Sequence, residues 1–224
     1  MKKQLFYAAG MMAITFLASC GGNASKSGEA GDAAKAGDSA GTYKVDAAAS
    51  NLEWRGWKIV KASEHKGTIS VKEGELKVEG GKLVAGSFVI DMNSIKCTDE
   101  KLDSVSKGKL AGHLKAKDFF DVEKYPTAKF EIVSVAEKAA EASTHEITGN
   151  LTLRDSARKI TFPANIKMEG NSISATGKAT INRLEWGVNY DSKNLGLAEA
   201  AQKAVKDGIV NKEMDITFNI KATK

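Results

Sequence analysis

The stretch ITFPANIKMEGNSISATGKATI, residues 160–181, decides the fold. Apolar and small residues recur at every second position on both sides of Glu169-Gly170-Asn171, a period typical of β-strands with one buried face. The three central residues are typical of a tight turn, so the stretch predicts a β-hairpin. The same period appears between Met214 and Lys221, where apolar and polar residues alternate. We therefore expect a mainly β domain.

Alternation of this kind recurs along most of the chain after Tyr43. It predicts further strands at residues 51–57, 67–71, 75–79, 83–90, 129–135 and 147–153. Their hairpin-scale spacing favours antiparallel pairing, either in two stacked sheets or in a closed barrel. A barrel of about eight strands has an interior that side chains fill or that admits one small ligand. The small residues on the predicted inward faces fit both alternatives: Ala164, Ala175, Gly177 and Ala179.

Two stretches interrupt the strand pattern. Residues 99–120 have spaced apolar positions that predict one or two short helices. Residues 195–210 carry a helix-like apolar stripe. This second helix is expected either to pack across a barrel opening or to act as a lid over a cavity.

The N-terminus has the layout of a secretory signal. Lys2 and Lys3 precede an uncharged apolar run that ends at Leu17, which is shorter than the roughly 20 residues that cross a bilayer. Residues 1–19 are therefore expected to be a cleaved signal peptide. The segment Leu17-Ala18-Ser19-Cys20 resembles the lipobox of bacterial lipoproteins. That resemblance implies that Cys20 carries diacylglycerol and an amide-linked acyl chain such as palmitate, and several chains on one residue make a stable anchor.

The residues after Cys20 are expected to form a flexible tether. Residues 20–42 contain mostly Gly, Ala, Ser and scattered charges, a composition that cannot bury enough apolar surface to order itself. The folded domain is expected over residues 43–224. No Asp directly follows Cys20. By resemblance to enterobacterial sorting rules, we expect a protein of the cell envelope, anchored in the outer membrane and facing the periplasm.

Composition and motifs argue against several classes of function. Removing Lys2 and Lys3 from the 33 basic residues leaves 31 − 28 = +3 for the mature chain, which does not predict nucleic-acid binding. The three histidines show no metal-ligand spacing, and no nucleophile with a base is recognisable. We expect no enzyme, metal or cofactor. Acylation of Cys20 would leave Cys97 without a disulfide partner.

Several segments together resemble the YceI family. The carrying segments are GHLKAKDFFDVEKYPTAKFEIVSV at 112–135, ITGNLTLRDSARKITFPANI at 147–166, INRLEWGVNY at 181–190 and the Tyr43-Lys44-Val45-Asp46 start. The resemblance implies a lipocalin-like antiparallel β-barrel, closed in part by short helices, that binds polyisoprenoids or other long-chain amphiphiles in its lumen.

The candidate ligand-binding residues are mostly aromatic: Trp54, Phe88, Phe130, Phe162, Arg183, Trp186 and Tyr190. Each aromatic residue has ordinary core packing as its alternative. The planar donors of Arg183 suit a phosphate or carboxylate head group, and its alternative is a structural ion pair with Glu185 or Asp191. His113 is expected to be a hydrogen-bonded structural residue.

The sequence thus predicts a membrane-anchored lipoprotein that binds or carries an isoprenoid or fatty acid derivative. The competing hypotheses are a scaffold with a filled barrel, whose lysine-rich loops contact an envelope partner, and an enzyme acting on a bound lipid or quinone. The oligomeric state is left open, with a dimer among the alternatives.

Overall fold

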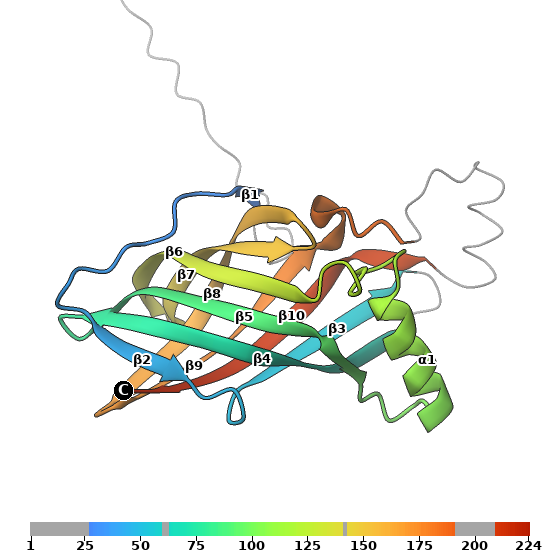
Figure 1. Ribbon diagram of the computed structural model, residues 1–224, viewed down its shortest axis with the longest axis horizontal. Helices are drawn as coiled ribbons and strands as arrows, with labels where there is room; N and C mark the ends of the chain where they lie inside the picture. Colours follow the sequence, from blue (N-terminus) through green and yellow to red (C-terminus); the bar gives the residue numbers. More distant parts are fainter. Residues whose placement is uncertain (1–26, 60–62, 141–142, 191–208) are drawn as a thin grey trace, which may run out of the picture.

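Eight antiparallel strands close into a barrel (Figure 1). The computed structural model describes residues 27–59, 63–140, 143–190 and 209–224. Each barrel strand pairs with the next along the chain, and β10 pairs with β3 to complete the circle. The predicted fold is confirmed. The strands are β3 Asn51–Lys58, β4 Glu64–Glu79, β5 Lys82–Cys97, β6 Thr127–Ala140, β7 Ser143–Leu153, β8 Ser156–Glu169, β9 Ser172–Asn182 and β10 Val210–Thr223.

The eight barrel strands follow the sequence pattern with one difference. The expected hairpin is present: β8 ends at Glu169, β9 begins at Ser172, and Gly170 between them has a φ of 56°. The two strands expected at 67–71 and 75–79 form the single strand β4. The register of β4 against β5 shifts between Val71 and Glu73. Such a bulge moves the alternation to the opposite phase, which is why one strand resembled two.

Two short strands complete the barrel wall. β2, Gly41–Val45, pairs with β4 and β10, and it takes the place of β3 at the end of the barrel away from α1. β1, Gly28–Glu29, pairs with Lys159 and Arg158 of β8. The pairing of β9 with β8 begins only at Ala164, so β1 covers an edge of β8 that β9 leaves open.

Residues 27–42, here named the strap, run along the outside of the barrel (Figure 1). The Asn150 side chain holds both backbone groups of Gly31: its Oδ1 accepts from the Gly31 nitrogen at 3.0 Å, and its Nδ2 donates to the Gly31 oxygen at 2.6 Å. The Ala34 nitrogen donates to the Ile132 oxygen at 2.8 Å. A free tether was expected over these residues. Backbone hydrogen bonds order the segment, and composition does not reveal such bonds.

We predict that Asn150→Ala releases the strap. The change removes two hydrogen bonds at a buried position, so it should lower the free energy of unfolding by about 1–2 kcal/mol. Hydrogen exchange of the amides at 28–36 should rise most. Thr152→Ala, two positions along β7, is the matched control. Unchanged exchange in the strap of Asn150→Ala would contradict this role of the side chain.

One helix lies at one end of the barrel (Figure 1). It is α1, Ser104–Lys115, and it packs against β5. The Asp103 carboxylate caps it by accepting from the Ser106 nitrogen at 2.8 Å, so the helix predicted within 99–120 is confirmed. A short 3-10 helix, η1 Arg183–Trp186, follows β9. Most of the helix expected at 195–210 lies outside the described residues. Within the described part, no helix is long and apolar enough to cross a bilayer.

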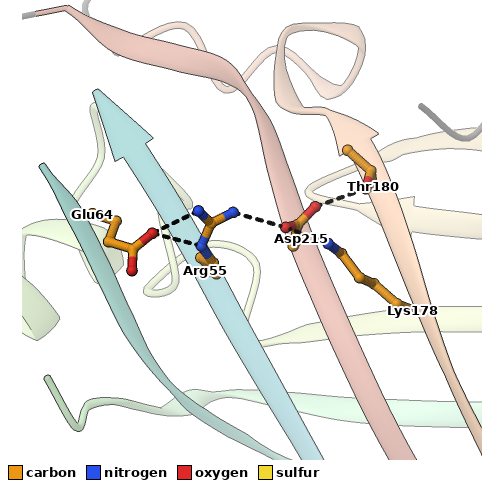
Figure 2. Close-up of polar contacts among 5 residues, drawn as sticks. All are labelled: Arg55, Glu64, Lys178, Thr180 and Asp215. Atoms are coloured by element: carbon orange, nitrogen blue, oxygen red, sulfur yellow. Dashed lines mark hydrogen bonds and ion pairs between the residues drawn. The ribbon is translucent and has the colours of Figure 1, made fainter. Parts of the chain in front are cut away.

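A polar network fastens four neighbouring strands near this end (Figure 2). The Asp215 carboxylate of β10 accepts from Thr180 Oγ1 at 2.7 Å and lies 2.8 Å from Lys178 Nζ, both on β9. Arg55 Nη1 of β3 donates to Asp215 at 3.1 Å, and Arg55 Nη2 reaches Glu64 of β4 at 2.6 Å. Burial by itself would raise the pKa of Asp215, but the hydrogen bonds from Lys178, Thr180 and Arg55 outweigh it and lower that pKa.

We predict a pH-dependent contribution of Asp215 to stability. Because its pKa is lowered on folding, its contribution is present above the unfolded pKa of about 3.9 and is lost as the pH falls through the folded value. Asp215→Asn should cost about 2 kcal/mol at pH 7 in urea unfolding, and the difference should shrink below about pH 4. Glu73→Gln, at an exposed site on β4, is the control. An equal cost at pH 7 and pH 3 would contradict the prediction.

Candidate ligand-binding site

The barrel encloses a cavity of about 570 Å³. This volume lies within the range of about 300–1,000 Å³ typical of small-molecule sites. Inward-facing aliphatic and aromatic side chains from all eight barrel strands line it. The polar lining residues gather where β3 ends, β10 begins and α1 lies, and this end is here named the mouth. They are Arg55, Lys58, Ser63, His65, His113, Arg183, Tyr190, Asn211 and Glu213.

Four phenylalanines form a belt across the apolar part of the cavity: Phe88, Phe130, Phe162 and Phe218. Neighbouring ring centroids lie 6.2, 5.6 and 5.4 Å apart in that order. All four rings line the cavity, and such tilted and edge-on pairs are favourable arrangements. The sequence singled out the first three but not Phe218. The alternation that runs from Met214 to Ile220 places Phe218 on the inward face, so the signal was available.

Rings of the belt fill the space where side chains at Gly149 and Gly177 would lie. A Cβ added to Gly149 would lie 2.2 Å from the Phe130 ring, and one added to Gly177 would lie 2.5 Å from the Phe218 ring. These glycines let aromatic rings lie against the sheet. Gly177 therefore provides close packing rather than space. Ala164 and Ala179, in contrast, line the cavity itself.

Gly56 borders open space inside the barrel. It lines the cavity opposite His65 of β4 and Met214 of β10. A Cβ added there would meet no atom within 4 Å, and Gly56 does not have a positive φ. A larger side chain at this position would enter the lumen near the mouth without backbone strain.

A histidine–aspartate pair lies at the mouth. His65 Nδ1 is 2.8 Å from Asp99 Oδ2, and Asp99 is buried. The hydrogen bond with His65, followed by one from the Lys101 backbone, lowers the pKa of Asp99, so this carboxylate stays ionised. Because Asp99 engages Nδ1, Nε2 is the ring nitrogen left for a ligand. Sequence reasoning missed this site, although His65 has the same phase as Gly67 and Ile69 along β4.

An aromatic cluster lines the mouth beside α1. Tyr190 lies edge-on to His113, with centroids 4.5 Å apart, and 5.8 Å from Phe119. His113 Nε2 is 3.2 Å from Asp118, a hydrogen bond of the structural kind expected for this residue. Trp54, opposite Gly67 in the pairing of β3 with β4, lines the cavity and donates from Nε1 to the Lys96 oxygen at 3.1 Å.

Arg183 lines the cavity and also donates hydrogen bonds to backbone carbonyls. Its side chain donates to the Asn211 oxygen at 3.0 Å, the Val188 oxygen at 2.5 Å and the Val210 oxygen at 3.3 Å. The residue is 2% exposed, and its guanidinium lies 5.7 Å from the Phe119 ring centroid. Arg183 therefore joins η1 to the start of β10. An ion pair with Glu185 or Asp191 stays a prediction, because Asp191 lies outside the described residues.

Trp186 lies in the core and is absent from the cavity lining. It is 1% exposed, and its Nε1 donates to the Leu151 oxygen at 2.8 Å. The six other candidate residues line the cavity, and contact between any of the seven and a ligand stays a prediction. Cys97 packs partly buried against the core. Across 27–59, 63–140, 143–190 and 209–224, no three His, Cys, Asp or Glu side chains converge as a metal site would require.

Comparisons with known proteins identify the family and the fold of the chain. The family model of the YceI-like domain matches residues 43–222. The chain belongs to the YceI-like family. This YceI-like chain is 31% identical over 133 residues to a UPF0312 protein of Pseudomonas putida, a match that covers 58% of the chain and 65% of that relative. A UPF0312 protein of Pseudomonas fluorescens is 27% identical over 157 residues, covering 66% and 77%.

Two solved structures share the YceI-like fold. BcnA of Burkholderia cenocepacia superposes with a TM-score of 0.58 at 23% identity, covering 80% of this chain and 99% of BcnA. A polyisoprenoid binding domain from Saccharophagus degradans superposes with a TM-score of 0.56 at 14% identity, covering 81% and 97%. At these identities the likeness concerns the fold.

Proposed function

We propose that this protein binds a single long-chain amphiphile, an isoprenoid or a fatty acid derivative, inside the barrel. The observation that carries the proposal is the open apolar cavity of about 570 Å³ with polar residues at one end. Such a lumen binds a hydrocarbon tail by removing it from water, at about 0.8 kcal/mol per methylene. A ~20-carbon chain offers roughly 16 kcal/mol before the costs of ordering it. The Saccharophagus relative, described as polyisoprenoid binding, supports this ligand class.

The polar residues of the mouth are proposed to hold the head group. His65, fixed by Asp99, presents Nε2 to a hydroxyl, carbonyl or acidic head. Tyr190 lies on the same rim. The tail would then extend past Gly56 toward the belt of Phe88, Phe130, Phe162 and Phe218.

A series of ligands with increasing chain length tests the proposal. Quenching of tryptophan fluorescence by prenyl alcohols and fatty acids should show an affinity that rises roughly tenfold for every two added carbons. The rise should stop once the cavity is full. An affinity that does not depend on chain length would contradict binding inside the barrel.

We further propose that the chain is a lipoprotein anchored through Cys20 in the outer membrane and facing the periplasm. The Leu17–Cys20 segment and the apolar run before it support this proposal. Cys20→Ser should move the protein from the membrane fraction to the soluble fraction, and mass spectrometry of the mature N-terminus should show acyl chains on Cys20. An unmodified Cys20 in the mature protein would contradict the anchor.

A further inference from the structure

The strap begins at the mouth of the cavity. Ser27 Oγ donates a hydrogen bond to the Glu185 carboxylate of η1, and Gly28 pairs with Lys159 of β8. The same short helix contributes Arg183 to the cavity lining. From this rim the strap runs to β2, which lies at the far end of the barrel (Figure 1). The described chain therefore starts beside the opening.

The distance between this rim and Cys20 is limited by covalent geometry. Only 27 − 20 = 7 residue steps join Cys20 to Ser27, and such a connection spans at most about 25 Å in any conformation. β4 alone has 16 residues, or roughly 50 Å at 3.3 Å per residue. An acyl anchor on Cys20 would hold the mouth near the bilayer. The hairpin at Gly80, at the opposite end of the barrel, would then lie farther from the bilayer than the mouth does.

The mouth end also carries apolar side chains that face solvent. In the described part of the chain, the large hydrophobic residues that stand exposed are Ile59, at 63%, and Val105, at 64%. Ile59 directly follows β3, whose last residue, Lys58, lines the mouth. Val105 lies in the first turn of α1, at the same end (Figure 1).

The helix α1 is basic. It carries Lys107, Lys109 and Lys115 and no acidic residue, whereas the carboxylates nearest in sequence lie on the segments before and after it. Lys101, Lys109 and Lys117 are exposed. Each lysine close to an anionic membrane surface contributes about 1 kcal/mol to binding. This charge and the exposed apolar side chains together fit a bilayer of anionic phospholipids.

We infer that the barrel rests with its mouth on an anionic phospholipid surface, with α1 and Ile59 in contact with the lipid. The strap sets this orientation. The hydrogen bonds of Gly31 with Asn150 and of Ser27 with Glu185 fix the place where the anchored chain leaves the barrel. A ligand then passes between bilayer and lumen without crossing bulk water. This inference rests on the lipid anchor and on the ligand binding proposed above.

Depth-dependent quenching tests the orientation. Acylated full-length protein in the Cys97→Ser background would carry a fluorescent label at Val105→Cys on the mouth side or at Lys82→Cys at the far hairpin. In vesicles of phosphatidylcholine and phosphatidylglycerol with doxyl-labelled lipids, we expect at least threefold stronger quenching at 105 than at 82. Equal quenching at both positions, or stronger quenching at 82, would overturn the inference.

Charge reversal on α1 gives a second test, which needs no cysteine label and therefore keeps Cys97. The double variant Lys107→Glu, Lys109→Glu changes α1 without touching the cavity lining. Transfer of a fluorescent prenyl ligand from phosphatidylglycerol vesicles should slow about tenfold, while the affinity for the same ligand in vesicle-free solution stays unchanged. If the double variant keeps both the wild-type transfer rate and the wild-type affinity, the membrane contact is refuted while the proposed ligand binding stands. Absence of binding in vesicle-free solution for the wild type would refute the proposed function itself.

Discussion

Replacing Gly56 with phenylalanine is expected to weaken binding of a long-chain amphiphile by at least about 100-fold while the barrel stays folded. The new ring would enter the open space at Gly56 and displace three or four methylenes of the ligand, which is worth about 2.7 kcal/mol. Because an added Cβ meets no atom there, the ring should cause little overpacking. Tryptophan-fluorescence titration measures the affinity, and urea unfolding measures the stability.

Gly56→Ala is the matched control at the same position. One methyl group leaves most of the cavity open, so its affinity should stay within about threefold of the wild type, or 0.7 kcal/mol. If Gly56→Phe is folded and still binds a ~20-carbon ligand as tightly as Gly56→Ala does, the ligand does not lie in the lumen.

Arg183→Met is expected to lower the free energy of unfolding by about 3 kcal/mol. The substitution keeps an apolar stem but leaves three backbone carbonyls, those of Val188, Val210 and Asn211, without the guanidinium that donates to them. Lysine should not rescue the protein, because a single ammonium cannot reproduce the planar fork. Urea unfolding with a mass-spectrometric or circular-dichroism readout gives the value.

The same variant separates a structural role of Arg183 from head-group recognition. Arg158→Met is the control, since half-buried Arg158 donates from Nε to one carbonyl, that of Glu185, at 3.3 Å. In Arg183→Met, the ratio of affinities for a fatty acid and for the alcohol of equal length should match the wild type. A selective loss of the acid, with stability intact, would instead assign Arg183 to the head group.

The fold was predictable because strand alternation survives in the sequence wherever one face is buried. The hairpin at Gly170 and the inward face of β10 follow directly from that period. Alternation misled at β4, because the bulge near Glu73 changes the phase within one strand. The strap could not be predicted from composition. Its order depends on hydrogen bonds of its backbone with the Asn150 side chain and with the Ile132 oxygen, and both partners are remote in sequence.

The site was predictable in type but not in detail. Aromatic residues on inward strand faces indicated Phe88, Phe130 and Phe162. Whether the lumen was open depended on how rings pack over cross-strand glycines, and no single strand contains that information. The roles of Arg183 and Trp186 depend on η1, where the alternating period ends. His65 acquires its role only through Asp99, 34 residues away.

Native mass spectrometry of the protein purified from its own membrane tests the central claim most directly. We expect the wild type to retain one amphiphile per barrel, visible as a mass increment that organic extraction removes and identifies as a prenyl or fatty acyl lipid. Gly56→Phe, purified in parallel, should lack the increment. A folded wild-type barrel that is repeatedly recovered without a ligand, and that acquires none when mixed with membrane lipid extract, would contradict the account.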